Sequence, residues 1–146
     1  PLTPQTIINV KAFNPDQVIL LPLYPQFSTT TTGSSFKEWH DQATKAGLVL
    51  PTCEIQDYYA DDDFIDAHVN MLLPVYDQAK AFGQPCILFS AHSLPQKVID
   101  KGDPYQKQTQ ASVQAIVQRL NAELEGPIDY QICYQSRVGP IKWLTP

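Results

Sequence analysis

Short apolar runs alternate along this chain with longer segments whose apolar residues recur at helical spacing. The runs predict strands at 17–23, 48–55, 86–89 and 128–134, and the periodic segments predict helices at 36–46, 64–82 and 105–124. Strands that alternate with helices predict an α/β fold with a mainly parallel sheet flanked by helices. The last helix has the clearest stripe, made of Val113, Ile116, Val117, Leu120 and Leu124.

Polar and turn-forming residues indicate where the helices begin and end. We expect Ser34 or Ser35 to cap the first predicted helix and Gly47 to end it. The acidic run 61–63 is expected to open the second helix, because carboxylates favour the positive end of a helix dipole. Phe82 is counted among the apolar residues of that helix.

The segment 85–95 reads Pro-Cys-Ile-Leu-Phe-Ser-Ala-His-Ser-Leu-Pro. Its apolar run predicts a strand covered by helices on both faces, and the polar residues from Ser90 onward predict a loop. His92 is therefore expected just past the carboxyl end of a buried strand, where open α/β sheets bind ligands. An imidazole there could bind a metal or accept a proton, or it could simply hydrogen-bond the loop backbone. Position alone does not separate these alternatives.

The other candidate groups have simpler interpretations. The hydroxyl-rich loop 28–35 could bind an anion, but it lacks phosphate-loop spacing, and a capped helix start is the default. His40 and His68 have no partner at helical spacing for a metal pair, and the acidic run has no calcium-loop pattern. Tyr134 and Trp143 could line a flat aromatic ligand or belong to the core.

Composition narrows the class of protein. The chain has 146 residues, 43% hydrophobic and 17% charged, which is typical of a globular protein. Its net charge of −5 disfavours a nucleic-acid partner. The widely spaced Cys53, Cys86 and Cys133 predict buried, reduced thiols in a cytoplasmic protein. The start at Pro1 and the stop at Pro146 suggest an internal piece of a longer protein.

Three motifs carry a resemblance to a known family. They are Leu-Pro-Leu-Tyr-Pro-Gln-Phe-Ser at 21–28 with Thr-Gly-Ser-Ser at 32–35, Phe-Ser-Ala-His-Ser-Leu-Pro at 89–95 with Gly-Asp-Pro-Tyr at 102–105, and Tyr-Gln-Ser-Arg-Val-Gly-Pro at 134–140 with Trp-Leu at 143–144. In order and spacing the chain resembles ferrochelatase, a lyase that inserts ferrous iron into a porphyrin in haem biosynthesis.

The resemblance implies a fold, a substrate pair and site residues. It implies two Rossmann-like chelatase domains, of which residues 1–57 and 58–146 would each be a part, with the porphyrin bound between them. His92 matches the family's active-site histidine, which handles the metal, a pyrrole proton, or both. Trp143 matches an aromatic residue of the porphyrin pocket, and Tyr134 stands where many relatives have Trp. Ser93 lies in a matching motif and is counted as a porphyrin-binding residue.

Two departures from the family pattern limit what this chain is expected to do. The second active-site motif, His-x-Glu, is expected beyond residue 146, so residues 1–146 alone are predicted to be inactive. Many relatives bind an iron–sulfur cluster through a cysteine where this chain has Thr29, so a cluster bound in that manner is not expected.

Two other functions stay open on the sequence alone. One is a related tetrapyrrole chelatase, acting on sirohydrochlorin or inserting cobalt. The other is a non-catalytic porphyrin-binding module. The sequence does not choose between protoporphyrin and coproporphyrin, gives no oligomeric state, and leaves peripheral association with the inner membrane open.

Overall fold

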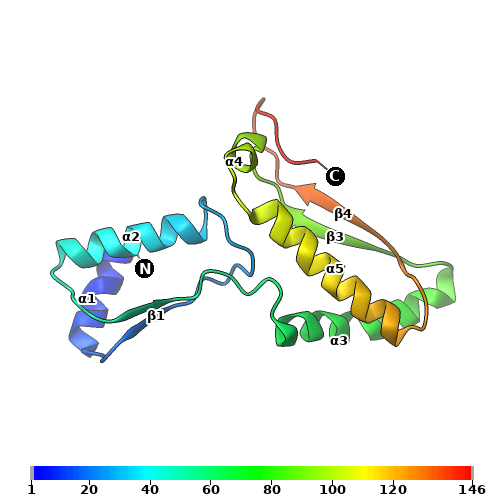
Figure 1. Cartoon of the computed structure of the whole chain (residues 1–146), viewed down its shortest axis with the longest axis horizontal. Coiled ribbons are helices and arrows are strands. Elements are labelled where there is room, and N and C mark those ends of the chain that lie inside the picture. Colours follow the sequence, from blue (N-terminus) through cyan, green and yellow to red (C-terminus); the bar gives the residue numbers. More distant parts are fainter. Residues whose placement is uncertain (1, 146) are drawn as a thin grey trace. The chain divides into compact units, whose positions relative to one another are not determined.

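The structure is a computed structural model that describes residues 2–145. The chain divides into two compact units, one ending at Asp57 and the other beginning at Tyr58, and each is described by itself. Each unit contains a pair of parallel strands with helices packed on it, which confirms the predicted α/β fold class (Figure 1). No helix within residues 2–145 is long and apolar enough to cross a membrane.

The first unit consists of α1 (Thr3–Phe13), β1 (Val18–Leu20), α2 (Thr32–Lys45) and β2 (Thr52–Glu54). The two strands are parallel, with Val18 opposite Thr52. Both helices contribute to one core cluster against the sheet face of Val18 and Leu20. On the alternate position, Ile19 is 59% exposed, so helices cover only one face of this sheet among the described residues. The buried members of the cluster are Ile7, Trp39 and Ala43.

Helix α2 begins earlier than the sequence predicted. Its N-cap is Thr31, and the Ser28 carbonyl accepts the backbone N–H groups of Thr31 at 3.2 Å and Gly33 at 3.0 Å. The expectation that Ser34 or Ser35 caps the helix is therefore wrong, because both residues lie inside α2. The Ser28 carbonyl already accepts the N–H groups of Thr31 and Gly33 at the start of the helix. The predicted helix end is confirmed, since Gly47 follows the helix with a φ of 62°.

The second unit consists of α3 (Asp62–Ala79), a short 3₁₀ turn (Lys80–Phe82), β3 (Cys86–His92), α4 (Gln96–Asp100), α5 (Tyr105–Glu123) and β4 (Asp129–Gln135). Strands β3 and β4 are parallel along their whole length, from Cys86 opposite Asp129 to His92 opposite Gln135. Strand β3 therefore continues through Ser90, where the polar residues of the sequence predict a loop. The pairing with β4 keeps the polar residues extended, and His92 is the last strand residue.

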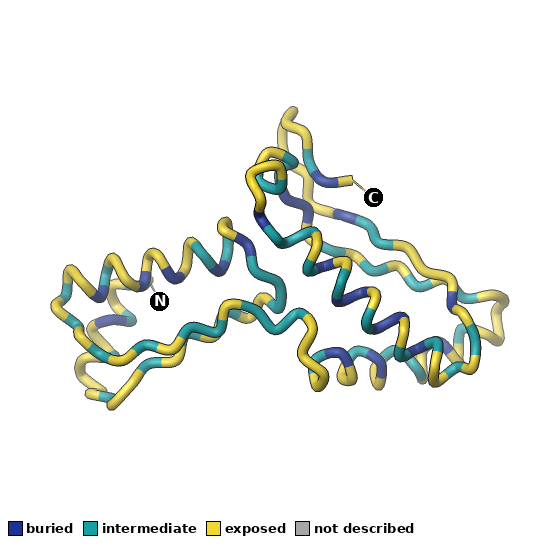
Figure 2. Tube along the Cα trace, in the orientation of Figure 1, coloured by how far each residue is buried: buried dark blue, intermediate teal, exposed yellow. Residues whose placement is uncertain are grey.

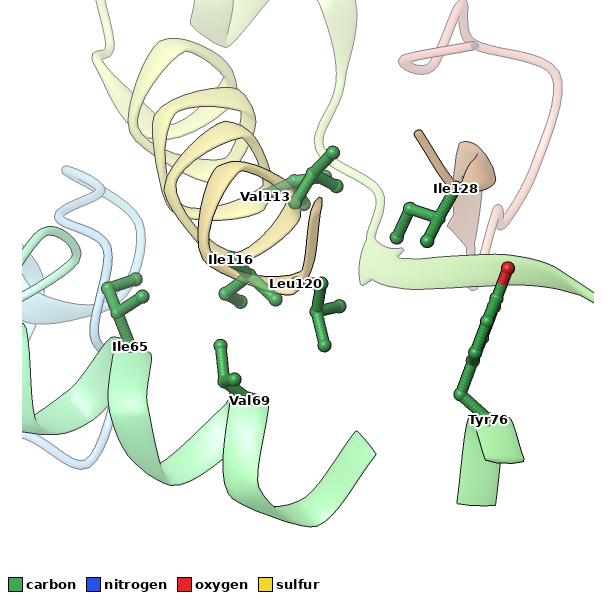
Figure 3. Packing of buried hydrophobic residues seen from close by; sticks show 8 residues of the cluster. Ile65, Val69, Tyr76, Val113, Ile116, Leu120 and Ile128 are labelled. Carbon is green, nitrogen blue, oxygen red and sulfur yellow. The ribbon is translucent and has the colours of Figure 1, made fainter. Parts of the chain in front are cut away.

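The core of the second unit lies between α3, α5 and one face of the sheet. Figure 3 shows Ile116 and Leu120 of α5 facing Ile65 and Val69 of α3, and Val113 belongs to the same core cluster. The predicted stripe on α5 is thus confirmed. Phe82 was assigned to the apolar side of the preceding helix, but it is 94% exposed, because α3 ends at Ala79 and the 3₁₀ turn directs the chain differently. Arg119 of α5 pairs with both Asp62 and Asp66 of α3.

The opposite face of the second sheet is uncovered by the described residues. Burial alternates along β3, with Ile87 and Phe89 half-buried and Leu88 64% exposed (Figure 2). The prediction of a strand buried on both faces is therefore wrong for this part of the chain. The same geometry corrects the prediction of buried thiols: the cysteines are free, but Cys53 and Cys86 are exposed and Cys133 is half-buried.

Candidate functional site

In the second unit, backbone hydrogen bonds join two segments that follow neighbouring strands, residues 93–96 after β3 and residues 136–144 after β4. The parallel ladder ends at His92 and Gln135, and the chain after each strand continues to pair with the other segment. Pro95 and Trp143 form an antiparallel bridge beyond the ladder. Three backbone hydrogen bonds join the segments, from Ser93 N to Gln135 O at 2.8 Å, from Leu144 N to Leu94 O at 2.9 Å and from Gln96 N to Lys142 O at 2.9 Å. The second and third sequence motifs therefore form one structural feature.

His92 lies at the centre of this feature with its side chain exposed. Alternation along β3 places it on the uncovered face, on the same side as Leu88 and Ser90. Its imidazole is accessible to a ligand, as the strand-end position predicted. Within residues 2–145 there is no group of three or more His, Cys, Asp or Glu side chains able to hold a metal ion. A metal at His92 would therefore need further ligands from outside this range or from the substrate itself.

Ser93 points into the protein. The residue is fully buried, and its hydroxyl donates to the Leu144 carbonyl at 3.2 Å. The motif of Ser93 predicts that this residue binds porphyrin. The structure gives its hydroxyl an internal partner, and it places Ser93 next to His92 without placing it on the same surface.

Trp143 belongs to the segment after β4 and is half-buried. Its indole N–H donates to the Val138 carbonyl at 3.0 Å, which fixes the ring across the polar turn after β4. Through the bridge to Pro95, the structure brings Trp143 into the feature that carries His92. An aromatic ring that remains partly accessible there can contact a flat apolar ligand.

Tyr134 lies on the other face of the sheet from His92. It stands opposite Ala91 in the ladder and is only 8% exposed, packed in a cluster with Leu94 and Leu144. Burial raises the pKa of its phenol, partly offset by the Gln106 side chain. The structure thus gives Tyr134 a packing position, and its predicted contact with a porphyrin stays a prediction.

Tyr105 is the last residue of the Gly-Asp-Pro-Tyr motif, which by itself predicts no separate role for it. Burial raises the pKa of its phenol, and interactions with the Thr109 side chain and the His92 backbone partly offset this rise. The side chain of the buried Asp103 accepts the Tyr105 backbone N–H at 3.1 Å. Tyr105 therefore interacts with the His92 backbone from the helix-covered side of the strand, and the local sequence pattern carried no signal of this contact.

The remaining sequence candidates have local partners. His40 pairs with Glu54 across the first unit. The Nδ1 atom of His68 lies 2.8 Å from the Phe64 carbonyl, and its ring packs on the Phe64 ring at 4.5 Å. Asp61 caps α3 by accepting the Phe64 backbone N–H at 3.0 Å, which confirms that the acidic run opens this helix.

The first motif lines a cavity within the first unit. This cavity of about 310 Å³ lies between α1, the end of β1 and α2, and Leu21, Pro22 and Tyr24 contribute to its walls. The loop that follows is organised by the Ser28 hydroxyl, which accepts the Thr30 backbone N–H at 3.1 Å. The loop thus leads into α2 through the hydroxyl and carbonyl of Ser28, while the N-cap residue Thr31 makes no side-chain capping bond.

Comparison with known proteins agrees with this arrangement of motifs. The ferrochelatase family model matches residues 1–146. The chain belongs to the ferrochelatase family. A ferrochelatase of Wolbachia sp. subsp. Drosophila simulans (strain wRi) is 50% identical over the whole chain, one of Caulobacter vibrioides (strain NA1000 / CB15N) is 49% identical, and one of Pelagibacter ubique (strain HTCC1062) is 45% identical.

These relatives are much longer than the chain. The aligned 146 residues cover 45% of the Wolbachia ferrochelatase, 40% of the Caulobacter protein and 41% of the Pelagibacter protein. The chain therefore spans less than half the length of the family members that it matches. The resemblance inferred from the three motifs is confirmed at the level of the family.

Proposed function

We propose that this chain is part of a protein that inserts ferrous iron into a porphyrin in haem biosynthesis. The observation that carries the proposal is the family match over all 146 residues. It is joined by an exposed His92 at the end of β3, whose following segment forms a β-bridge with Trp143. Insertion replaces two pyrrole protons by one ferrous ion, and the oxidation state of the iron does not change. A protein that performs it must accept protons, guide the metal and grip a flat ring.

His92 is the residue that we assign to the proton and metal steps. An imidazole at an accessible strand end can take a proton from a pyrrole nitrogen and can also bind an incoming ferrous ion. The hydrogen bonds around Ser93 hold the strand end in place, so that little reorganisation is needed when the porphyrin binds. Trp143 supplies the neighbouring aromatic surface on which a macrocycle can stack.

The two compact units support a proposal about domains. We assign residues 1–57 to one chelatase domain and residues 58–146 to a second, each completed by parts of the whole protein outside this range. The division of contacts between Asp57 and Tyr58 supports this boundary. We also propose a cytoplasmic location, on the ground of three free cysteines, and no iron–sulfur cluster bound through Thr29, since a hydroxyl does not replace a thiolate ligand.

The proposal is tested by anaerobic assay of the whole protein with ferrous iron and either protoporphyrin or coproporphyrin. Loss of the free-porphyrin absorption spectrum and formation of the haem spectrum are expected with one of the two. Residues 1–146 alone are expected to show no insertion, because residues 2–145 contain no group of three or more metal-ligating side chains, and His92 would need further ligands to hold the iron. A whole protein that binds both porphyrins but metallates neither would contradict the proposal and favour a carrier.

A further inference from the structure

Ser93 makes two hydrogen bonds to the segment that follows the other strand. Its backbone N–H donates to the Gln135 carbonyl at 2.8 Å, and its hydroxyl donates to the Leu144 carbonyl at 3.2 Å. The first bond extends the ladder by one residue past His92. The second reaches the residue next to Trp143. The Ser93 side chain thus links the segment of His92 to the segment of Trp143.

The environment of this link makes it stiff. Ser93 is fully buried and Leu144 is 1% exposed, so water does not compete for the hydrogen bond. A buried carbonyl that loses its donor is costly, which strongly favours the conformation in which the hydroxyl and the carbonyl meet. The reciprocal bond from Leu144 N to Leu94 O, at 2.9 Å, closes the link on both sides. The hydroxyl has no accessible surface from which to contact a large substrate.

We propose that Ser93 is a positioning residue, whose hydroxyl holds His92 in register with Trp143 through the Leu144 carbonyl and does not contact the porphyrin. This inference rests on the proposed function, because it assigns a role in placing groups for that reaction. A misplacement of a reacting group of about 1 Å can lower a rate by about a hundredfold. Removal of the hydroxyl should therefore affect turnover much more than it affects porphyrin binding.

Ser112 is a matched control within the same unit. It is also buried, at 4% exposure, and its hydroxyl donates to the backbone carbonyl of Tyr59 at 2.7 Å, 53 residues away in the sequence. The Ser93 bond spans 51 residues. Substitution of either serine by alanine removes one long-range hydrogen bond from a hydroxyl to a backbone carbonyl; the bond of Ser112 is part-buried, and its hydroxyl also lies 3.1 Å from the Gln108 carbonyl. Only Ser93 adjoins His92, so the two variants separate positioning from general stability.

The experiment compares Ser93→Ala and Ser112→Ala in the whole protein. For Ser93→Ala we expect kcat to fall at least about tenfold and KM for porphyrin to change less than about threefold, and for Ser112→Ala we expect both constants near those of the unsubstituted protein. A second measurement is independent of activity. With 5-fluorotryptophan incorporated, the ¹⁹F resonance of Trp143, assigned by its loss in Trp143→Phe, should shift in Ser93→Ala and not in Ser112→Ala.

The outcomes separate the inference from the function on which it rests. An unsubstituted protein without iron insertion would refute the proposed function, while the ¹⁹F shift would still test the link between the two segments. Unchanged kcat in Ser93→Ala, or an equal loss in Ser112→Ala, would overturn the inference. A rise in porphyrin KM alone, with kcat and the ¹⁹F resonance of Trp143 unchanged, would also overturn the inference, because it would indicate direct contact between Ser93 and the porphyrin. If Ser93→Ala does not fold, Ser93→Cys, with similar volume and a weaker donor, is measured against the same expectations.

Discussion

His92 and Gln135 stand opposite each other at the last position of the parallel ladder between β3 and β4. The next residue after His92 donates its backbone N–H to the Gln135 carbonyl, so the pairing does not fray where the strand ends. The imidazole meanwhile projects from the uncovered face of the sheet. A fixed backbone that carries an accessible side chain is what a group needs if it is to act repeatedly in one geometry.

The core of the second unit predicts a large stability difference between two apolar residues. Leu120 is fully buried in the cluster between α3 and α5, whereas Phe82 is 94% exposed. We expect Leu120→Ala to lower the free energy of unfolding by about 2–5 kcal/mol, because it leaves a cavity in a packed core. Phe82→Ala should change it by less than about 0.5 kcal/mol. Denaturant unfolding of the whole protein measures both, and equal losses would contradict the packing described.

The start of α3 predicts different roles for two neighbouring acids. Asp61 accepts the Phe64 backbone N–H, whereas Asp63 lies in the first turn of the helix. We expect Asp61→Ala to cost about 1 kcal/mol of stability and Asp61→Asn to cost much less, because asparagine caps helices equally well. Asp63→Ala removes the same charge without removing the cap and serves as the control. Thermal unfolding that ranks Asp63→Ala below Asp61→Ala in stability would refute the cap assignment.

The phenols of the half-buried Tyr105 and the buried Tyr134 predict a loss of stability at alkaline pH. Burial raises the pKa of Tyr105 and of Tyr134 in the folded protein, whereas unfolded tyrosine titrates near pH 10. Above about pH 10 the unfolded chain therefore binds fewer protons than the folded one, and the free energy of unfolding falls as pH rises toward the folded pKa values. Below that pH both states keep the proton, and these groups contribute no pH dependence.

A double variant isolates this effect. In the double variant Tyr105→Phe/Tyr134→Phe, the urea midpoint should fall less steeply between about pH 9 and pH 11 than in the unsubstituted protein. The reason is that the two phenols with raised pKa are absent. Single variants assign the contribution of each residue. An identical slope with and without the two hydroxyls would show that neither phenol is held in its neutral form by the fold.

The sequence predicted those features of the fold that depend on local periodicity. The stripe on α5, the acidic start of α3 and the Gly47 helix end all follow from neighbours within a few residues, and all are confirmed. The exposure of Leu88 did not follow, because an apolar run does not indicate which of its faces other segments cover. The start of α2 was misplaced because the acceptor of its first N–H groups, the Ser28 carbonyl, lies in the preceding loop.

The candidate site shows a similar division. The strand-end position of His92 followed from the order of apolar and polar residues along β3. The inward direction of Ser93 did not, because its partner Leu144 lies 51 residues away and meets it only when the segment after β4 returns. The direction of the Tyr134 side chain did not follow either, because its parity in the ladder places it on the helix-covered face; its predicted contact with a porphyrin stays a prediction. Long-range pairing, which the local pattern does not encode, determines the direction of both side chains.

The role proposed for His92 is tested most directly by its substitution in the whole protein, with His40→Ala as the control. His40 is also exposed, but it pairs with Glu54 in the first unit. Both variants are assayed anaerobically for iron insertion and titrated with porphyrin to measure binding. We expect His92→Ala to abolish insertion and still bind porphyrin, and His40→Ala to behave as the unsubstituted protein. Normal turnover in His92→Ala would contradict the assignment of His92 to the proton and metal steps.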